Sequence, residues 1–166
     1  MIEKERELVK NFIANSLSKE QFLNSFTVDI LNNHGYIINL LEEAYKEKDA
    51  NDVDYLLYLI FTFDLVTEEY IDLLIKLMYA PWHYKHEDIA TIFQSFKFPQ
   101  TVECLYKTAI TEFEYLDYDE SYALAVKCIW ALGAIKTDDS RKKLEVLSQS
   151  ENEIIRDNAI KQLERN

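Results

Sequence analysis

The chain has 166 residues, and 48% of them are hydrophobic, which is enough apolar material for one folded domain and excludes general disorder. Only two glycines and two prolines occur, which disfavours all-β folds, because they need many tight turns, and phosphate-binding loops, because they need glycine clusters. The net charge of −12 disfavours direct binding to nucleic acid, whose phosphates would be repelled. We therefore expect an all-α protein.

The first half of the chain is predicted to form helices of uneven length. A first helix covers residues 3–17, and Ser18 is expected to cap a short helix through Phe26. Gly35 is expected to interrupt or bend the next helical segment. Asn51 or Asp52 is expected to cap a helix over 53–63, and Thr67 one over 68–79.

The second half shows more regular helical periodicity. Pro81 ends the preceding helix, and Pro99 suits the first position of another. Gly133 and Lys136 are interpreted as a termination signal for the clearest helix. The predicted helices here cover residues 87–96, 99–110, 120–134, 140–147 and 152–163. About eight or nine helices are expected in all.

Two segments near the C-terminus are similar to each other. LAVKCIWAL (residues 124–132) and IRDNAIKQL (155–163) align at a period of 31 and pair large aliphatic residues with one small residue at helical spacing. Stacked helical hairpins require this pattern. A looser match relates residues 89–105 to 128–144 at an offset of 39. Chance matching of helical periodicity remains the alternative for both.

These copies resemble HEAT repeats, in which an aliphatic residue, a small residue and a leucine precede a short turn and a second amphipathic helix. The resemblance implies a HEAT-like helical-hairpin solenoid forming a single domain over 1–166, with an irregular part at 1–80 and the repeats at 81–166. One departure is that the usual Val-Arg pair appears as Val126-Lys127 and Ile155-Arg156, in different registers. The residues that carry the resemblance are Leu124, Cys128, Leu132, Gly133, Asp138, Leu144, Leu147, Ile155, Arg156, Ala159 and Leu163.

A narrower resemblance concerns PWHYKHEDIATIF (residues 81–93), followed by KFPQTVECL and IWALGAIKT. These blocks are similar to small bacterial HEAT-like proteins that act as immunity partners of polymorphic toxins. The resemblance implies a cytoplasmic, non-catalytic protein that masks a toxin domain, and the acidity would suit a basic nuclease toxin. A generic HEAT-type adaptor or scaffold remains the alternative.

Two acidic, tyrosine-bearing stretches are candidate protein-binding surfaces. No Lys or Arg occurs from Asp49 to Ile75 or from Thr111 to Val126. Surplus acid attracts basic protein, and tyrosine gives a large contact area with few torsions to order. A solvated helix face or loop is the alternative for each. The expected partner-binding residues are Asp52, Asp54, Tyr55, Tyr58, Glu68 and Glu69 in the first stretch, and Glu114, Tyr115, Asp117, Tyr118, Asp119 and Glu120 in the second.

His83 and His86, with Glu87 and Asp88, form the one dense group of metal-type side chains in the sequence. Histidines three residues apart share a helix face and could bind one ion. The segment reads HxxHED rather than HExxH, and a third ligand is missing. We therefore expect no metal or cofactor, and a metal-binding or enzymatic role for these histidines is the least favoured alternative. A structural role, with His83 bonded to a loop carbonyl, is expected.

The remaining features indicate a cytoplasmic protein without a membrane segment. The start of the chain, MIEKERELVK, is charged, unlike a signal peptide. The most apolar run, residues 55–63, is too short to span a bilayer. Cys104 and Cys128 lack CxxC spacing and are expected to be reduced thiols in the core.

Overall fold

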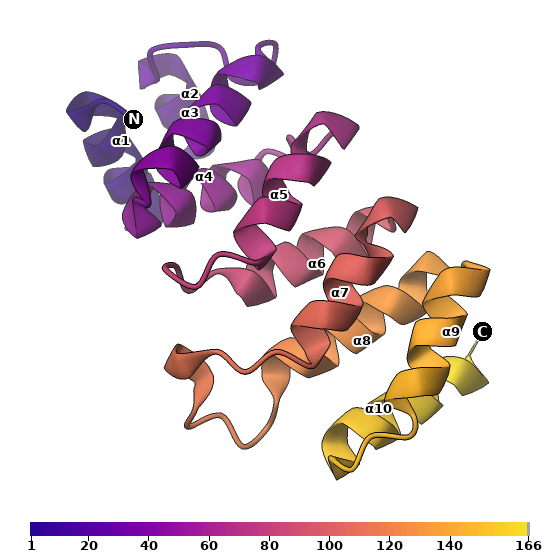
Figure 1. Cartoon of the computed structure of the whole chain (residues 1–166). Helices are drawn as coiled ribbons and strands as arrows, with labels where there is room; N and C mark the ends of the chain where they lie inside the picture. The colour runs from indigo at the N-terminus through magenta and orange to yellow at the C-terminus, as the bar shows by residue number, and fades with distance from the viewer. Residues whose placement is uncertain (166) are drawn as a thin grey trace. The chain divides into compact units, whose positions relative to one another are not determined.

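The computed structural model describes residues 1–165, with the side chain of His34 excepted (Figure 1). Ten α-helices and three short 3-10 helices account for its secondary structure, and the described residues contain no strand. The predicted all-α class is confirmed, with ten α-helices rather than eight or nine. They are α1 (Glu3–Ile13), α2 (Lys19–Ser25), α3 (His34–Glu47), α4 (Ala50–Thr62), α5 (Ile71–Met78), α6 (His86–Phe96), α7 (Val102–Ala109), α8 (Ala123–Ile135), α9 (Asp138–Leu147) and α10 (Glu153–Glu164); the 3-10 helices are η1 (Glu68–Tyr70), η2 (Pro99–Thr101) and η3 (Glu114–Leu116).

The chain divides into two compact units, Met1–Leu73 and a second that begins at Leu74. The boundary falls inside α5. Each unit has its own core, and each is described separately below. No helix of the described residues is both long and apolar enough to cross a membrane.

An aromatic cluster forms part of the core of the N-terminal unit. The ring of Phe12 from α1 stacks on Phe22 from α2 with centroids 4.6 Å apart and on Phe63 with centroids 5.6 Å apart. These contacts join α1, α2 and the end of α4. Such stacked pairs add to the free energy gained from burying the rings themselves. The irregular helices of this unit are therefore held by specific side-chain packing.

The predicted helix caps and the predicted helix break in the N-terminal unit are confirmed at one position and wrong at three. Ser18 caps α2 by accepting a hydrogen bond from the amide of Gln21 at 3.2 Å. Asp49, rather than Asn51 or Asp52, caps α4. Thr67 makes no capping bond, and its buried hydroxyl has no hydrogen-bond partner among the described residues. Gly35 does not interrupt a helix, because it lies in the first turn of α3.

Helix α8 is the centre of the C-terminal unit. It contacts α6, α7, α9 and α10 and buries most of its surface against them, while Val126, Lys127 and Trp130 lie on a partly exposed face. Contacts link α6 to α8 and α8 to α10, and also α7 to α9, so these helices form two adjacent rows (Figure 1). Cys104 and Cys128 are both buried here, which confirms their expected place in the core.

Gly133 has a different role from the predicted one. It lies inside α8 rather than at its end, and the C-cap is Lys136, whose φ of 57° is left-handed. A Cβ built on Gly133 would lie 2.3 Å from the Oε1 atom of Gln162 on α10. The glycine therefore allows α8 and α10 to approach closely.

Candidate functional site

The connection between α7 and α8, residues 110–122, is folded into turns although it contains no α-helix. We call it the acidic ridge. It contains η3 and two hydrogen-bonded turns, in which the amide of Leu116 donates to the carbonyl of Phe113 and the amide of Asp119 to that of Leu116, both at 2.8 Å. The acidic ridge thus holds its side chains in defined positions.

Asp119 fastens the acidic ridge to the start of α8. Its carboxylate accepts hydrogen bonds from the amide of Ala123 at 2.8 Å and from the amide of Ser121 at 3.0 Å, and the Ser121 hydroxyl donates to it as well. These bonds lower the pKa of Asp119, since they favour its charged form. Tyr122, with a φ of 52°, makes the sharp turn into the helix. Asp119 is therefore chiefly a helix-capping residue.

The buried side chain of His86 holds the first part of the acidic ridge by a hydrogen bond and a ring contact. The Tyr115 hydroxyl donates to Nδ1 of His86 at 2.9 Å, while Nε2 of His86 donates to the Ala80 carbonyl at 3.0 Å. The His86 ring also lies against Phe113, with centroids 4.3 Å apart. Residues from α6, the α5–α6 connection and the acidic ridge thus meet at one imidazole.

His83 completes this cluster. Its ring stacks on that of His86 with centroids 4.3 Å apart, its Nε2 donates to the Leu77 carbonyl at 2.8 Å, and its Nδ1 accepts from the Lys85 amide at 3.0 Å. His83 does bond to a backbone carbonyl, but this carbonyl belongs to the last turn of α5 and not to a loop as predicted. Because all four ring nitrogens of the pair are engaged, neither imidazole has a lone pair to offer a metal.

Both histidines are fully buried, and burial lowers the pKa of each. For His86, burial is the larger cause and the neighbouring His83 a smaller one, and its pKa falls to about 4. The imidazoles are therefore neutral at pH 7. Burial also raises the pKa of Tyr115 well above its ordinary value, so its hydroxyl keeps the proton that it donates to His86.

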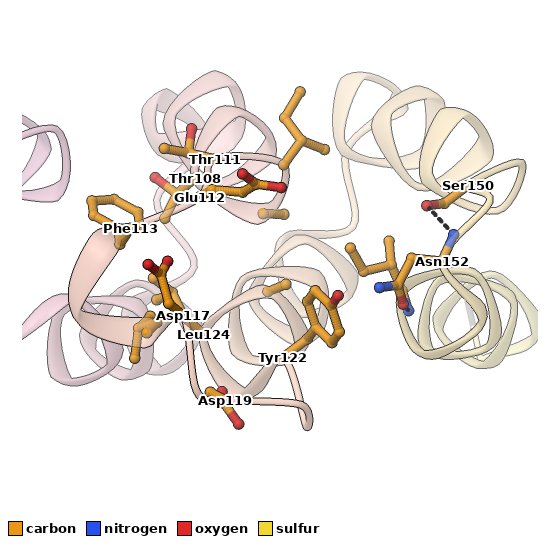
Figure 2. Close-up of a pocket in the computed structure, with 15 residues that line it drawn as sticks. Thr108, Thr111, Glu112, Phe113, Asp117, Asp119, Tyr122, Leu124, Ser150 and Asn152 are labelled. Carbon is orange, nitrogen blue, oxygen red and sulfur yellow. Dashed lines mark hydrogen bonds between the residues drawn. The ribbon is translucent and has the colours of Figure 1, made fainter.

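Two hollows flank the acidic ridge. The first, of about 530 Å³, lies among the end of α7, the start of α8 and the α9–α10 turn; the second, of about 750 Å³, lies on the side of the α5–α6 connection. Thr108, Thr111, Glu112 and Phe113 line both and so form the wall between them. Figure 2 shows the first hollow, with Phe113 on one side and Asn152 on the opposite side.

Four tyrosines around these hollows are exposed, whereas Tyr115, which also lines the second hollow, is half-buried. Every tyrosine that is exposed in the described part of the chain lies here: Tyr79 and Tyr84 line the second hollow, Tyr122 lines the first, and Tyr118, 82% exposed, lies on the acidic ridge. Ile110, at the rim of the first hollow, is 55% exposed. Aromatic and aliphatic surface gathered around a concave site is characteristic of protein interfaces.

The carboxylates of the acidic ridge differ from the helical acids of the same unit. Glu87 pairs with Lys127 at 3.0 Å, and Glu103 pairs with Lys143 at 2.7 Å. Among the described residues, no Lys or Arg lies within ion-pairing distance of a carboxylate of the acidic ridge, and none lines either hollow. The site therefore carries uncompensated negative charge.

Some residues of the second predicted stretch are exposed, and others hold the acidic ridge in its fold. Glu114, Asp117, Tyr118 and Glu120 are exposed, whereas Tyr115 is half-buried. Tyr115 and Asp119 make the hydrogen bonds that hold the acidic ridge in place. Sequence reasoning did not select Ile110, Glu112, Tyr79 or Tyr84. Tyr79 and Tyr84 lie between α5 and α6, far from this stretch in the sequence, and Ile110 gave no signal; Glu112 belongs to the same base-free run.

The first predicted stretch lies in the N-terminal unit and includes one residue that is unsuited to binding a partner. Asp52 is 2% exposed and bonded to Arg6 at 2.7 and 2.9 Å and to the amino group of Met1 at 3.1 Å. Burial alone would raise the pKa of Asp52, but these bonds outweigh it and lower the pKa. This burial argues against contact with a partner. Glu68 and Glu69 are exposed, and Asp54, Tyr55 and Tyr58 are half-buried.

Comparison with known proteins does not identify a relative. No protein family matches the chain, and neither a curated protein nor a solved structure is significantly similar to it. The function must therefore be argued from the site itself.

Proposed function

We propose that the chain is a non-catalytic protein-binding module that takes a basic partner on the acidic ridge and its two hollows. The observation that carries the proposal is the coincidence of exposed tyrosines with carboxylates that lack a cationic partner in the described chain. Isolated carboxylates in a tyrosine-rich hollow complement lysine and arginine side chains, and the overall charge of −12 would speed the encounter.

The sharpest form of this proposal is an immunity protein that occludes a basic toxin domain, such as a nuclease. Its support is the resemblance of residues 81–93, followed by 97–105 and 129–137, to HEAT-like immunity proteins. The two helix rows α6–α8–α10 and α7–α9 are compatible with stacked HEAT-like hairpins. A cytoplasmic location follows from this form of the proposal. A generic adaptor would use the same surface for a partner that is not toxic.

The test uses the protein domain encoded beside this chain as the partner. Calorimetry should show a tight complex that is weakened by Glu112→Lys with Asp117→Lys, two exposed positions at the first hollow. Glu145→Lys with Glu164→Lys is the matched control, because both residues are exposed on α9 and α10 and the net charge changes equally. Absence of a complex, or equal weakening by both pairs, would contradict the proposal.

Co-expression separates the immunity protein from the adaptor. If the chain is an immunity protein, it should restore growth to cells that produce the neighbouring domain, and the Glu112→Lys, Asp117→Lys variant should not. Binding without rescue would identify an adaptor. A neighbouring domain that does not slow growth by itself would leave the toxin form without support.

A further inference from the structure

We infer that the first hollow is the anchor site for an arginine side chain of the partner. This inference rests on the proposed function and adds the chemistry of the contact. The hollow, of about 530 Å³, is within the range of volumes, about 300–1,000 Å³, of pockets that enclose whole ligands. It can therefore admit a long side chain together with part of its backbone.

The walls of the hollow combine three kinds of group that suit a guanidinium. Glu112 and Asp117 supply carboxylates from two points of the acidic ridge, and Figure 2 draws both among the residues that line the hollow. Tyr122 supplies an aromatic ring, and Leu116 and Leu124 supply apolar surface for an aliphatic stem. A guanidinium can bond to carboxylates and stack on an aromatic face at the same time.

A buried hydroxyl at the base of this wall gives independent support. Thr108 is 2% exposed, and its Oγ1 has no nitrogen or oxygen partner among the described residues; it shares a hydrogen bond with the Cys104 thiol, which is a weak partner. Buried polar atoms normally have a nitrogen or oxygen partner. A donor that enters the hollow would give Thr108 one.

The unit already contains a cation held by the same pair of groups. Nζ of Lys143 lies 2.7 Å from the Glu103 carboxylate and 4.3 Å from the centre of the Tyr106 ring. On the acidic ridge the carboxylates and the tyrosine are present, and no Lys or Arg of the described residues lines the hollow. Arginine is favoured over lysine because its planar fork carries five donors and can reach carboxylates on two sides, whereas an ammonium is a point charge.

The test is a titration of the full chain with two peptides of equal charge, Ac-(Gly-Arg)₃-NH₂ and Ac-(Gly-Lys)₃-NH₂, followed by amide shifts in NMR spectra. The arginine peptide should shift the amides of residues 108–125 and 150–155 saturably and bind about threefold or more tightly than the lysine peptide. Equal affinity for the two peptides, or shifts spread over other acidic surfaces, would overturn the inference.

Neutral variants locate the contact. Glu112→Gln with Asp117→Asn should weaken the arginine peptide about fivefold, the size expected for losing two exposed ion pairs, and remove its advantage over lysine. Glu145→Gln with Glu164→Gln should change neither. If the neighbouring domain binds through Glu112 and Asp117 while the peptides do not differ, the arginine anchor is wrong and the proposed function stands. Loss of both effects would overturn both.

Discussion

Single residues decide how the acidic ridge is held, and His86 is the clearest case. Its imidazole is fully buried, stacked on His83, and bonded through both nitrogens to groups from two other segments. Burial and, to a smaller extent, the neighbouring His83 ring disfavour a positive charge on His86, and they outweigh the Ala80 carbonyl, which favours one. A residue that resembles a metal ligand in the sequence is thus a neutral structural link.

This environment predicts a loss of stability in mild acid. The ordinary histidine pKa of 6.5 falls to about 4 in the folded chain, so between these values the unfolded chain binds the proton more readily. The free energy of unfolding should therefore fall as the pH drops from 6.5 towards 4, and His86 alone would contribute about 3 kcal/mol of the loss.

The measurement is urea unfolding at pH 7 and pH 4.5 for the natural chain and for His86→Gln. Carboxylates titrate in both proteins, so the difference between their pH profiles isolates the histidine. The variant should start from a lower stability at pH 7 and lose less of it on acidification. Parallel profiles would show that His86 does not carry this pH dependence.

At the scale of elements, the start of α8 depends on a cap supplied by the acidic ridge. Asp119→Ala removes the acceptor for the amides of Ser121 and Ala123 and should cost about 1 kcal/mol of stability. Asp117→Ala, two residues earlier and exposed, should leave stability nearly unchanged. Thermal unfolding measures both, and hydrogen exchange of the Ala123 amide should accelerate only in the Asp119 variant. Equal stability losses would contradict the assignment of the cap.

Replacing each of the two glycines of the chain by alanine should change the stability in opposite directions. A Cβ on Gly35 would have Asn33 as its nearest neighbour, at 3.9 Å, so Gly35→Ala in α3 should stabilise the chain by up to about 1 kcal/mol. A Cβ on Gly133 would collide with Gln162, so Gly133→Ala should destabilise by about 1–3 kcal/mol.

Denaturant unfolding of both variants tests this contrast. Adding Gln162→Ala to Gly133→Ala should recover part of the loss, because it removes Oε1 and Cδ, the two atoms closest to the new methyl group, and leaves only Cβ at 3.0 Å. Additive losses in the double variant would show that the side chain of Gln162 is not what limits this position.

The same glycines show how far the sequence can predict elements. Helical periodicity located most helices, because burial of an amphipathic face largely determines where they form. It could not distinguish a glycine that ends a helix from one that lets two helices approach, because both fall late in the helical pattern. Likewise, Asn51 or Asp52 was predicted to cap α4, whereas Asp49 caps it. The contact with Arg6, 46 residues away in the chain, gives Asp52 a different role.

The sequence predicted the candidate site only where aromatic and acidic residues lie together in one segment. The alternation of aromatics and carboxylates marked residues 113–122 as a surface. The hollows depend on residues from four other places, including Tyr79 and Tyr84 before α6 and Asn152 before α10. No local pattern relates these residues, because only the packing of α6, α7 and α10 around α8 brings them to one side.

At the scale of the whole molecule, the surplus acid should act in opposite ways on stability and on binding. A net charge of −12 repels itself in the folded chain, so added salt should raise the thermal midpoint of the isolated protein. The same salt screens the attraction of a basic partner.

Association with the neighbouring domain should therefore slow by about tenfold or more between roughly 0.01 M and 0.15 M NaCl, as measured by stopped-flow fluorescence. Dissociation should change much less, because it depends on the close contacts of the acidic ridge rather than on long-range attraction. The Glu145→Lys, Glu164→Lys variant supplies the comparison: its net charge is −8, calculated as −12 + 4, and the acidic ridge is intact. Its association should be slower at low salt and its dissociation unchanged. An association rate that does not respond to salt would show that the negative charge does not guide the encounter.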